Sequence, residues 1–243
     1  MVPIKQLLAG ADIHCQTFGR PLVTLSYAQS LDGCLALQRG APLALSGGEA
    51  LQLTHHLRAA HDAILIGVGT LLADNPRLAV RLVAGEDPQP VVLDSRLRTP
   101  AEANLLVEGR KPWIACGENT DPQKQARLIS AGARLLPFPL DESSRLPLPE
   151  VLACLAELGV KTLMVEGGAR VITAFLEARL VDRVVLTVTP AFAGGLRAID
   201  GLTSAQQEGS AAGTTGLLRL HQPGYERLGD DLIVWGSLPQ GLL

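Results

Sequence analysis

Short apolar runs alternate with segments of helical periodicity along most of this chain, and this alternation limits the possible folds more than any other feature. Apolar runs of roughly four to eight residues are typical of strands buried on both faces of a sheet. The pattern therefore predicts an α/β fold with a mostly parallel sheet flanked by helices. The expected strands are residues 22–27, 63–66, 90–93, 113–116, 133–137, 162–165 and 183–188. The expected helices are residues 48–60, 122–131, 149–158 and 169–178.

The pattern changes after Gly194. Residues 216–238, GLLRLHQPGYERLGDDLIVWGSL, contain short apolar runs interrupted by Pro-Gly and Gly-Asp-Asp, which favour turns between antiparallel strands. We therefore expect a mixed sheet with antiparallel C-terminal strands at one edge. A length of 243 residues suits a single domain over residues 1–243, in which residues 1–20 form an N-terminal extension.

Composition excludes several classes of function. The net charge of -3 and the pI of about 6.0 give no basic surface for nucleic acid. The N-terminus lacks the apolar core of a signal peptide, and no apolar run is long enough to span a membrane, so we expect a cytoplasmic protein. Four cysteines without a Cys-x-x-Cys pair predict reduced, buried thiols.

Three histidines cluster in the sequence LTHHLRAAHD, at His55, His56 and His61. On a helix His55 and His56 point about 100° apart, and no carboxylate stands at a metal-ligand spacing beside them. We expect these histidines to be solvated or to cap the helix, and we expect no metal site.

Three of the expected strands end in loops rich in glycine or small polar residues. These loops follow Ile66, Leu93 and Val165, and they should share the edge of a parallel sheet at which ligands bind. At Gly167 and Gly168 the backbone could approach a diphosphate closely, with the N-terminus of the helix from Ala169 directed at the same point. The alternative is a tight turn that needs positive φ. Thr70 and Asp74, one helical turn apart after a second glycine-rich exit, could face the same ligand.

The loop LDSRLR adds a hydroxyl and two guanidinium groups, from Ser95, Arg96 and Arg98. Arginine binds phosphate bidentately, so this loop suits the 2′-phosphate of NADPH better than the bare ribose of NADH. Solvated surface charge is the alternative. The chain has no Gly-x-Gly-x-x-Gly dinucleotide fingerprint, no Gly-x-Ser-x-Gly elbow and no Gly-Lys-Ser/Thr phosphate loop.

These motifs together resemble the reductase family of riboflavin biosynthesis, which has a dihydrofolate-reductase-like fold and occurs alone or as the C-terminal half of a deaminase-reductase. The resemblance runs from RPLVTLSYAQSLDG at Arg20 to AFAGG ending at Gly195. Its specific elements are SLDG, LRAAHDAILIGVGTLLADNPRLAVR, VVLDSRLRTP and VEGGARVITAFLEARLVD. YAQSLDG is similar to the stand-alone archaeal and fungal enzymes, which act before deamination.

The resemblance implies an NADPH-dependent reductase that converts the ribosylamino group of a pyrimidinone 5′-phosphate to ribitylamino. It implies a homodimer. No deaminase half is expected, because nothing in the sequence matches His-x-Glu with Pro-Cys-x-x-Cys, the zinc deaminase pattern. NADPH contacts are implied at Ala28, Thr70, Asp74, Ser95, Gly167, Gly168 and Ala169. Substrate contacts are implied at Arg58, Leu78, Arg81 and Glu166, and the two arginines are chemically apt to clamp the ribose 5-phosphate.

The candidate acid-base groups are Glu166 and Asp32, although Asp32 could equally cap a turn. The chain departs from the bifunctional bacterial branch at Ser26, where lysine is usual, and at Pro42 and Ala44, where a Ser-x-Trp pair is usual. The alternatives are a reductase of the same fold acting on a pterin or another pyrimidine, and an NADPH-binding protein without turnover. Whether the substrate is the diamino or the deaminated pyrimidine stays open here.

Overall fold

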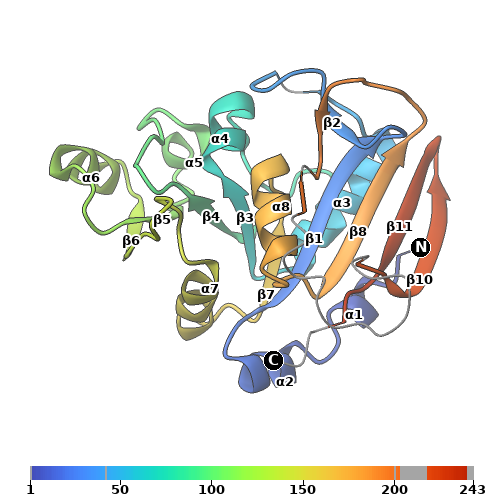
Figure 1. The fold of residues 1–243 in the computed structure, drawn as a ribbon, viewed down its shortest axis with the longest axis horizontal. Helices are drawn as coiled ribbons and strands as arrows, with labels where there is room; N and C mark the ends of the chain where they lie inside the picture. Colours follow the sequence, from blue (N-terminus) through green and yellow to red (C-terminus); the bar gives the residue numbers. More distant parts are fainter. Residues whose placement is uncertain (1, 42, 200, 203–217, 240–243) are drawn as a thin grey trace.

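The computed structural model describes residues 2–41, 43–199, 201–202 and 218–239 (Figure 1). The strands are β1 (Leu22–Ser30), β2 (Cys34–Ala36), β3 (Ala63–Gly67), β4 (Gln89–Leu93), β5 (Trp113–Gly117), β6 (Arg134–Phe138), β7 (Thr162–Val165), β8 (Arg183–Thr189), β9 (Leu196–Arg197), β10 (His221–Leu228) and β11 (Asp231–Ser237). Within the described residues, nine of them form one sheet in the order β10-β11-β8-β1-β7-β3-β4-β5-β6, and β2 pairs with β9.

Helices cover both faces of this sheet. They are α1 (Ile4–Leu7), α2 (Ala11–Phe18), α3 (Gly48–Ala60), α4 (Val68–Asp74), α5 (Asn104–Val107), α6 (Pro122–Ser130), α7 (Leu148–Glu157) and α8 (Ala169–Glu177). Ala63 and Leu65 of β3 belong to the core under α7 and α8, whereas Ile64 and Ile66 belong to the core under α4, α5 and α6. Met164 of β7 packs with α3 on this second side. Residues on both faces of a central strand are thus buried, which is why the sequence of such a strand is an unbroken apolar run.

The predicted mixed sheet is confirmed. β1 pairs in parallel with β7 and β8, β3 with β7 and β4, and β5 with β4 and β6, whereas β11 pairs antiparallel with β8 and β10. All seven expected strands and all four expected helices are present, with ends shifted by a few residues. Of the stretch expected to form the antiparallel edge, residues 216 and 217 lie outside the described part.

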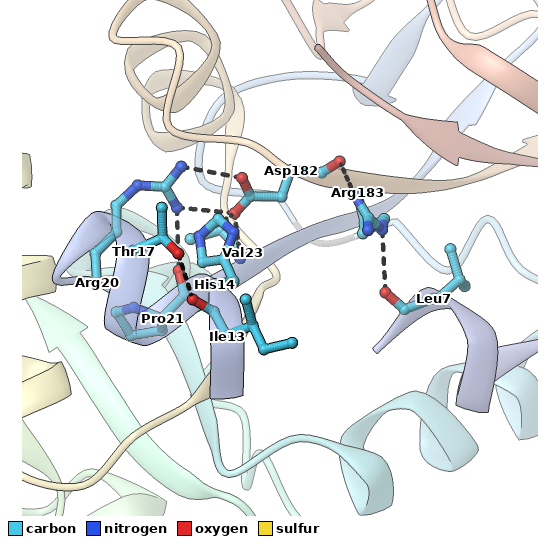
Figure 2. A network of polar contacts seen from close by, with 9 residues as sticks. All are labelled: Leu7, Ile13, His14, Thr17, Arg20, Pro21, Val23, Asp182 and Arg183. Carbon is cyan, nitrogen blue, oxygen red and sulfur yellow. Dashed lines mark hydrogen bonds and ion pairs between the residues drawn. The ribbon is translucent and has the colours of Figure 1, made fainter. Parts of the chain in front are cut away.

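The N-terminal segment, residues 2–20, is attached to the edge of the sheet where β1 and β8 begin (Figure 2). Asp182 accepts hydrogen bonds from Nη1 of Arg20 at 2.8 Å, from Nη2 of Arg20 at 3.0 Å and from the amide of Val23 at 2.7 Å. Arg183 donates from Nε to the Leu7 carbonyl at 3.0 Å. In the described part of the chain, no helix is both long and apolar enough to cross a membrane.

Candidate active site

A cavity of about 850 Å³ opens where the parallel strands end. β1, β3 and β4 contribute Ala28, Gly67 and Leu93 to its wall, and the turn after β7 contributes Glu166. Because β1, β7, β3 and β4 are consecutive neighbours in the sheet, their carboxyl ends meet at this edge. The volume lies within the range typical of small-molecule sites.

Ten of the predicted site residues line this cavity. They are Ala28, Arg58, Thr70, Asp74, Leu78, Arg98, Glu166, Gly167, Gly168 and Ala169. The other four, Asp32, Arg81, Ser95 and Arg96, do not belong to its lining as the structure describes it.

The turn between β7 and α8 requires glycine for close packing. The expected alternative, a turn with positive φ, is wrong, because φ at Gly168 is -73° and Gly167 is not among the glycines with positive φ. A Cβ atom at Gly167 would lie 2.6 Å from Cβ of Val171, and one at Gly168 would lie 3.0 Å from Oγ1 of Thr70. Gly168 precedes α8 and has no side chain to cap it, so the first N–H groups of this helix are available to an anion in the cavity.

Thr70 and Asp74 lie on α4, one turn apart, and both line the cavity. The contact between Gly168 and Oγ1 of Thr70 brings the exits of β3 and β7 together. The two glycine-rich loops that the sequence singled out therefore form one wall.

Arg58 and Glu166 form a paired charge inside the cavity. Nε and Nη2 of Arg58 each donate to a carboxylate oxygen of Glu166 at 2.7 Å, and Nη1 donates to the Ala79 carbonyl at 3.2 Å. The side chains are only 12% and 17% exposed, so this bidentate pair is poorly screened by solvent. Burial lowers the pKa of Arg58, but Glu166 and Asp87 together outweigh burial, so the pKa of Arg58 rises above its ordinary value. The sequence predicted both residues but not their contact.

Leu78 is buried in the cavity wall, with φ of 51°. Arg81, three residues later, is exposed, and its backbone amide donates to Nδ1 of His55 at 3.0 Å. The two predicted phosphate ligands thus differ: Arg58 is fixed by a carboxylate inside the cavity, and Arg81 lies at the surface.

The loop after β4 separates the three residues that the sequence grouped as one phosphate site. Arg98 lines the large cavity, whereas Ser95 and Arg96 line a second cavity of about 410 Å³ together with Asn119 and Thr120. The chain reverses at Leu97, where φ is 50°, and Asp94 closes the turn by accepting from the amide and hydroxyl of Thr99. Both arginines are exposed, and the turn directs them to different cavities.

Asp32 lies in the turn after β1 and fixes a distant loop. Its carboxylate accepts from the Ser30 hydroxyl at 2.5 Å and from the amides of Ala193 and Gly194 at 3.0 and 2.7 Å. These bonds hold the pKa of Asp32 well below its ordinary value, the bond from Ser30 having the largest effect. A carboxylate held in this way is a poor proton donor, so the contacts favour the turn-capping alternative.

The expectation for the histidines is partly wrong. His56 is exposed and His61 caps α3, but both His55 and His61 are buried. The ring of His61 bonds through Nδ1 to the Leu57 carbonyl at 2.7 Å and through Nε2 to the Thr24 hydroxyl at 2.8 Å. His55 has no exposed surface, because the connection formed by residues 78–88 covers the face of α3 that was expected to be solvated.

The departures from the bifunctional branch are close to the cavity. Ser26 and Ala44 line it, and Pro42 lies outside the described residues.

Tyr27, Thr54 and Thr187 also line the cavity but were not predicted, because isolated polar residues on a strand or helix carry no local signal of a site. Burial raises the pKa of Tyr27, so its phenol is neutral near pH 7.

A family model and curated relatives match this chain. The model described as the RibD C-terminal domain matches residues 21–234. The riboflavin biosynthesis protein RibD of Bacillus amyloliquefaciens is 37% identical over 185 residues, which are 75% of this chain and 49% of that protein. The 2,5-diamino-6-ribosylamino-4(3H)-pyrimidinone 5′-phosphate reductase of Methanothermobacter thermautotrophicus is 35% identical over 224 residues, 88% of this chain and 97% of that protein. The chain spans about half the length of the RibD relatives that it matches.

Solved structures share the fold. RibD of Acinetobacter baumannii aligns with a TM-score of 0.78 at 23% identity, over 95% of this chain and 61% of that one. Dihydrofolate reductase of Enterococcus faecalis aligns with a TM-score of 0.50 at 12% identity, over 90% of this chain and 97% of that one. The expected dihydrofolate-reductase-like fold is confirmed.

Proposed function

Because the chain belongs to the RibD C-terminal domain family, we propose that it is an NADPH-dependent reductase of riboflavin biosynthesis. It converts the ribosylamino group of a pyrimidinone 5′-phosphate to a ribitylamino group. The Arg58–Glu166 pair carries the proposal, because it presents a cation and an anion to a ligand in the same cavity as an uncapped helix N-terminus.

The wall made by the two glycine-rich loops fits the diphosphate of NADPH. Gly168 leaves room for a close approach beside Thr70, and the N–H groups that begin α8 suit a negative group. Arg98 adds a cation to the same cavity, and Arg96 with Ser95 suits the 2′-phosphate at the second cavity. NADPH, when bound, supplies the hydride that C1′ of the sugar accepts.

Arg58, Glu166, Leu78 and Arg81 bind the substrate. Three of the five N–H donors of Arg58 are used by Glu166 and Ala79, which leaves two for a ligand. Glu166 accepts hydrogen bonds from the pyrimidine or the sugar, and it is the better acid-base candidate because it lines the cavity, whereas Asp32 lies outside the lining and fixes a turn. Arg81 reaches the 5′-phosphate from the surface. The main contribution of these residues is to hold two phosphorylated molecules in the reacting geometry.

We infer that the substrate is the diamino pyrimidinone and not the deaminated compound. The Methanothermobacter relative, which this chain matches over 97% of its length, is named for the diamino substrate. The test measures NADPH oxidation with the diamino compound, the deaminated compound and dihydropterin in parallel. The proposal predicts the highest kcat/KM for the diamino compound. Highest activity with the pterin would contradict the assignment to this pathway.

The resemblance also supports a homodimer. Sedimentation velocity at micromolar concentration would distinguish a dimer from the 25.6 kDa monomer. A single species at the monomer mass would contradict this part of the proposal.

A further inference from the structure

The irregular segment formed by residues 78–88 covers the outer side of α3 and buries His55. A Cβ atom at Gly85 would lie 2.5 Å from Cβ of Ala59, so the segment touches this helix closely. Ala50, Leu53 and Leu57 of the same helix face the sheet core, and His55 faces the segment through its contact with Arg81. The burial of His55 therefore depends on this segment and not on the sheet.

Two α3 residues, one turn apart, hold neighbouring peptide groups of the segment. His55 accepts from the Arg81 amide at 3.0 Å, and Arg58 donates to the Ala79 carbonyl at 3.2 Å. The far end is fixed by Asp87, which accepts from the Val80 amide at 2.6 Å. Arg110 contacts Asp87 and donates to the Pro88 carbonyl at 2.9 Å. Contacts from α3 and from Asp87 thus hold the backbone next to Arg81. The contact to the Arg81 amide itself comes from His55.

The contact with Arg81 fixes the proton on His55. Because Nδ1 accepts a hydrogen bond, the neutral ring carries its proton on Nε2. Nε2 is buried and has no hydrogen-bond partner among the described residues. An unsatisfied buried N–H is destabilising, and an apolar side chain would avoid it. Packing alone therefore does not explain a histidine at this position.

We propose that His55 is a positioning residue for substrate binding, which holds Arg81 in place for the substrate phosphate through the bond from the Arg81 amide to Nδ1. The inference rests on the proposed function, in which Arg81 binds this phosphate. His55 itself lies beneath the segment and does not touch the substrate.

Protonation of His55 would abolish this contact, because Nδ1 would then carry a proton facing the Arg81 amide. The charged groups around the ring are Arg58 on its own helix, Arg81 and Asp87 on the segment, and Glu166 after β7. Burial has the largest effect on the pKa of His55 and lowers it; the two arginines lower it further, and Glu166 and Asp87 raise it in part. His55 is therefore neutral near pH 7, and the segment loses this contact in acid.

The experiment compares His55→Leu, His55→Asn and the control His56→Leu, which alters the exposed neighbour on the same helix. Asparagine places an acceptor oxygen near the position of Nδ1 but does not titrate. We expect His55→Leu to raise KM for the phosphorylated substrate about tenfold, with kcat and NADPH affinity changed less than about twofold. His55→Asn should keep KM close to the parent value at pH 8, and His56→Leu should change nothing.

The pH dependence separates positioning from a general packing role. The substrate phosphate titrates near pH 6 in every variant, so His55→Asn serves as the reference. Because the pKa of His55 is lowered by burial, the profiles are measured from pH 6.5 down to the pH at which the parent unfolds, and over this range KM should rise more steeply in the parent than in His55→Asn. Parallel profiles would overturn the proposal, as would an equal rise in KM for the dephosphorylated substrate in His55→Leu. If His55→Leu does not fold, the profiles of the parent and His55→Asn still decide.

Turnover by the parent enzyme distinguishes an error in the proposed function from an error in the role of His55. If the parent does not oxidise NADPH with any ribosylaminopyrimidine phosphate, the function is wrong. If the parent turns over and the His55 variants behave like it at every pH, the function stands and the positioning role is wrong.

Discussion

At the scale of residues, the paired charges in the cavity change how Glu166 acts. A lone carboxylate beside a coenzyme diphosphate should oppose binding of the coenzyme. In the structure Arg58 holds both carboxylate oxygens, so the charge of Glu166 is compensated within the protein. The two residues therefore act as one unit, and a change in either alters the other.

Glu166→Gln should lower kcat/KM at least about tenfold, equivalent to roughly 1.4 kcal/mol of transition-state stabilisation. The amide keeps one acceptor for Arg58 but loses the charge and the bidentate contact. Because Arg58 already compensates the carboxylate, NADPH affinity should change less than about twofold. Steady-state turnover and fluorescence titration of NADPH measure the two quantities. Glu157→Gln, on the exposed part of α7, is the control, and equal turnover in both variants would assign Glu166 a purely structural role.

Arg96 and Arg98 should have different effects on coenzyme choice, because the turn at Leu97 directs them to different cavities. Arg96→Ala should weaken NADPH binding roughly 10- to 150-fold and change NADH little, since a charge-assisted bond contributes about 1.5 to 3 kcal/mol. Arg98→Ala should weaken both coenzymes to a similar degree. Titration of each variant with NADPH and NADH measures this, and an unchanged preference for NADPH in Arg96→Ala would place the 2′-phosphate elsewhere.

The sequence could predict the glycine turns and the charged residues but not their contacts. Glu166 and Arg58 are 108 positions apart, and only pairing of β7 with β3 and packing of α3 bring them together. The burial of His55 was missed for a similar reason, because the segment that covers it has no periodicity of its own. The sequence could not show that Arg96 and Arg98 line different cavities, because the reversal at Leu97, a leucine with positive φ, has no signal in the sequence.

At the scale of elements, burial on both faces made the central strands easy to predict. Short elements were missed. Within the part of the chain that the structure describes, β2 and β9, with three and two residues, pair only with each other, and α1 and α5 are single turns of four residues. Such pieces are stabilised by the contacts around them and contain too few residues to establish a period.

The packing of α8 against the glycine turn should be sensitive to one added methyl group. Gly167→Ala would bring Cβ to within 2.6 Å of Val171, which should destabilise the protein by about 1 to 3 kcal/mol. Adding Val171→Gly, which removes both Cβ and Cγ1 of Val171, should recover part of this loss, with a coupling of at least about 1 kcal/mol in a double-mutant cycle. Urea unfolding measures each variant.

Gly69→Ala is the matched control for this prediction. Its Cβ would meet nothing within 4 Å, and the residue lies in α4. It should therefore stabilise the protein by about 0.4 to 1 kcal/mol. Destabilisation of similar size at both positions would contradict the packing explanation.

At the scale of the whole molecule, binding and stability depend on opposite ends of the parallel strands. The cavity lies where the strands end, and the Arg20–Asp182 network lies where β1 and β8 begin (Figure 2). Arg20→Ala leaves a buried carboxylate without its main cation and should destabilise the protein by about 3 kcal/mol, while kcat stays unchanged. Arg227→Ala, which breaks an ion pair exposed at 74% and 86%, should cost less than about 1 kcal/mol. Equal losses would contradict the importance of burial.

Two buried histidines, His55 and His61, and the half-buried His14 should make the molecule less stable in acid. Burial lowers the pKa values of His14, His55 and His61 below 6.5, although nearby groups raise each of them in part. The unfolded chain therefore binds more protons than the folded protein below about pH 6.5, and stability falls as the pH falls. Urea unfolding from pH 7.5 to pH 5.5 measures the slope. His61→Asn should reduce that slope, and an unchanged slope would contradict a lowered pKa of His61 in the folded state.

In the proposed reaction, this chain transfers a hydride to C1′ of a ribosylaminopyrimidine phosphate. The most direct measurement follows the label from NADPH that carries deuterium at the transferable C4 position, with 2,5-diamino-6-ribosylamino-4(3H)-pyrimidinone 5′-phosphate as the acceptor. We expect one deuterium at C1′ of a ribitylamino product for each NADPH oxidised. A product without deuterium, or NADPH oxidation without this product, would contradict it.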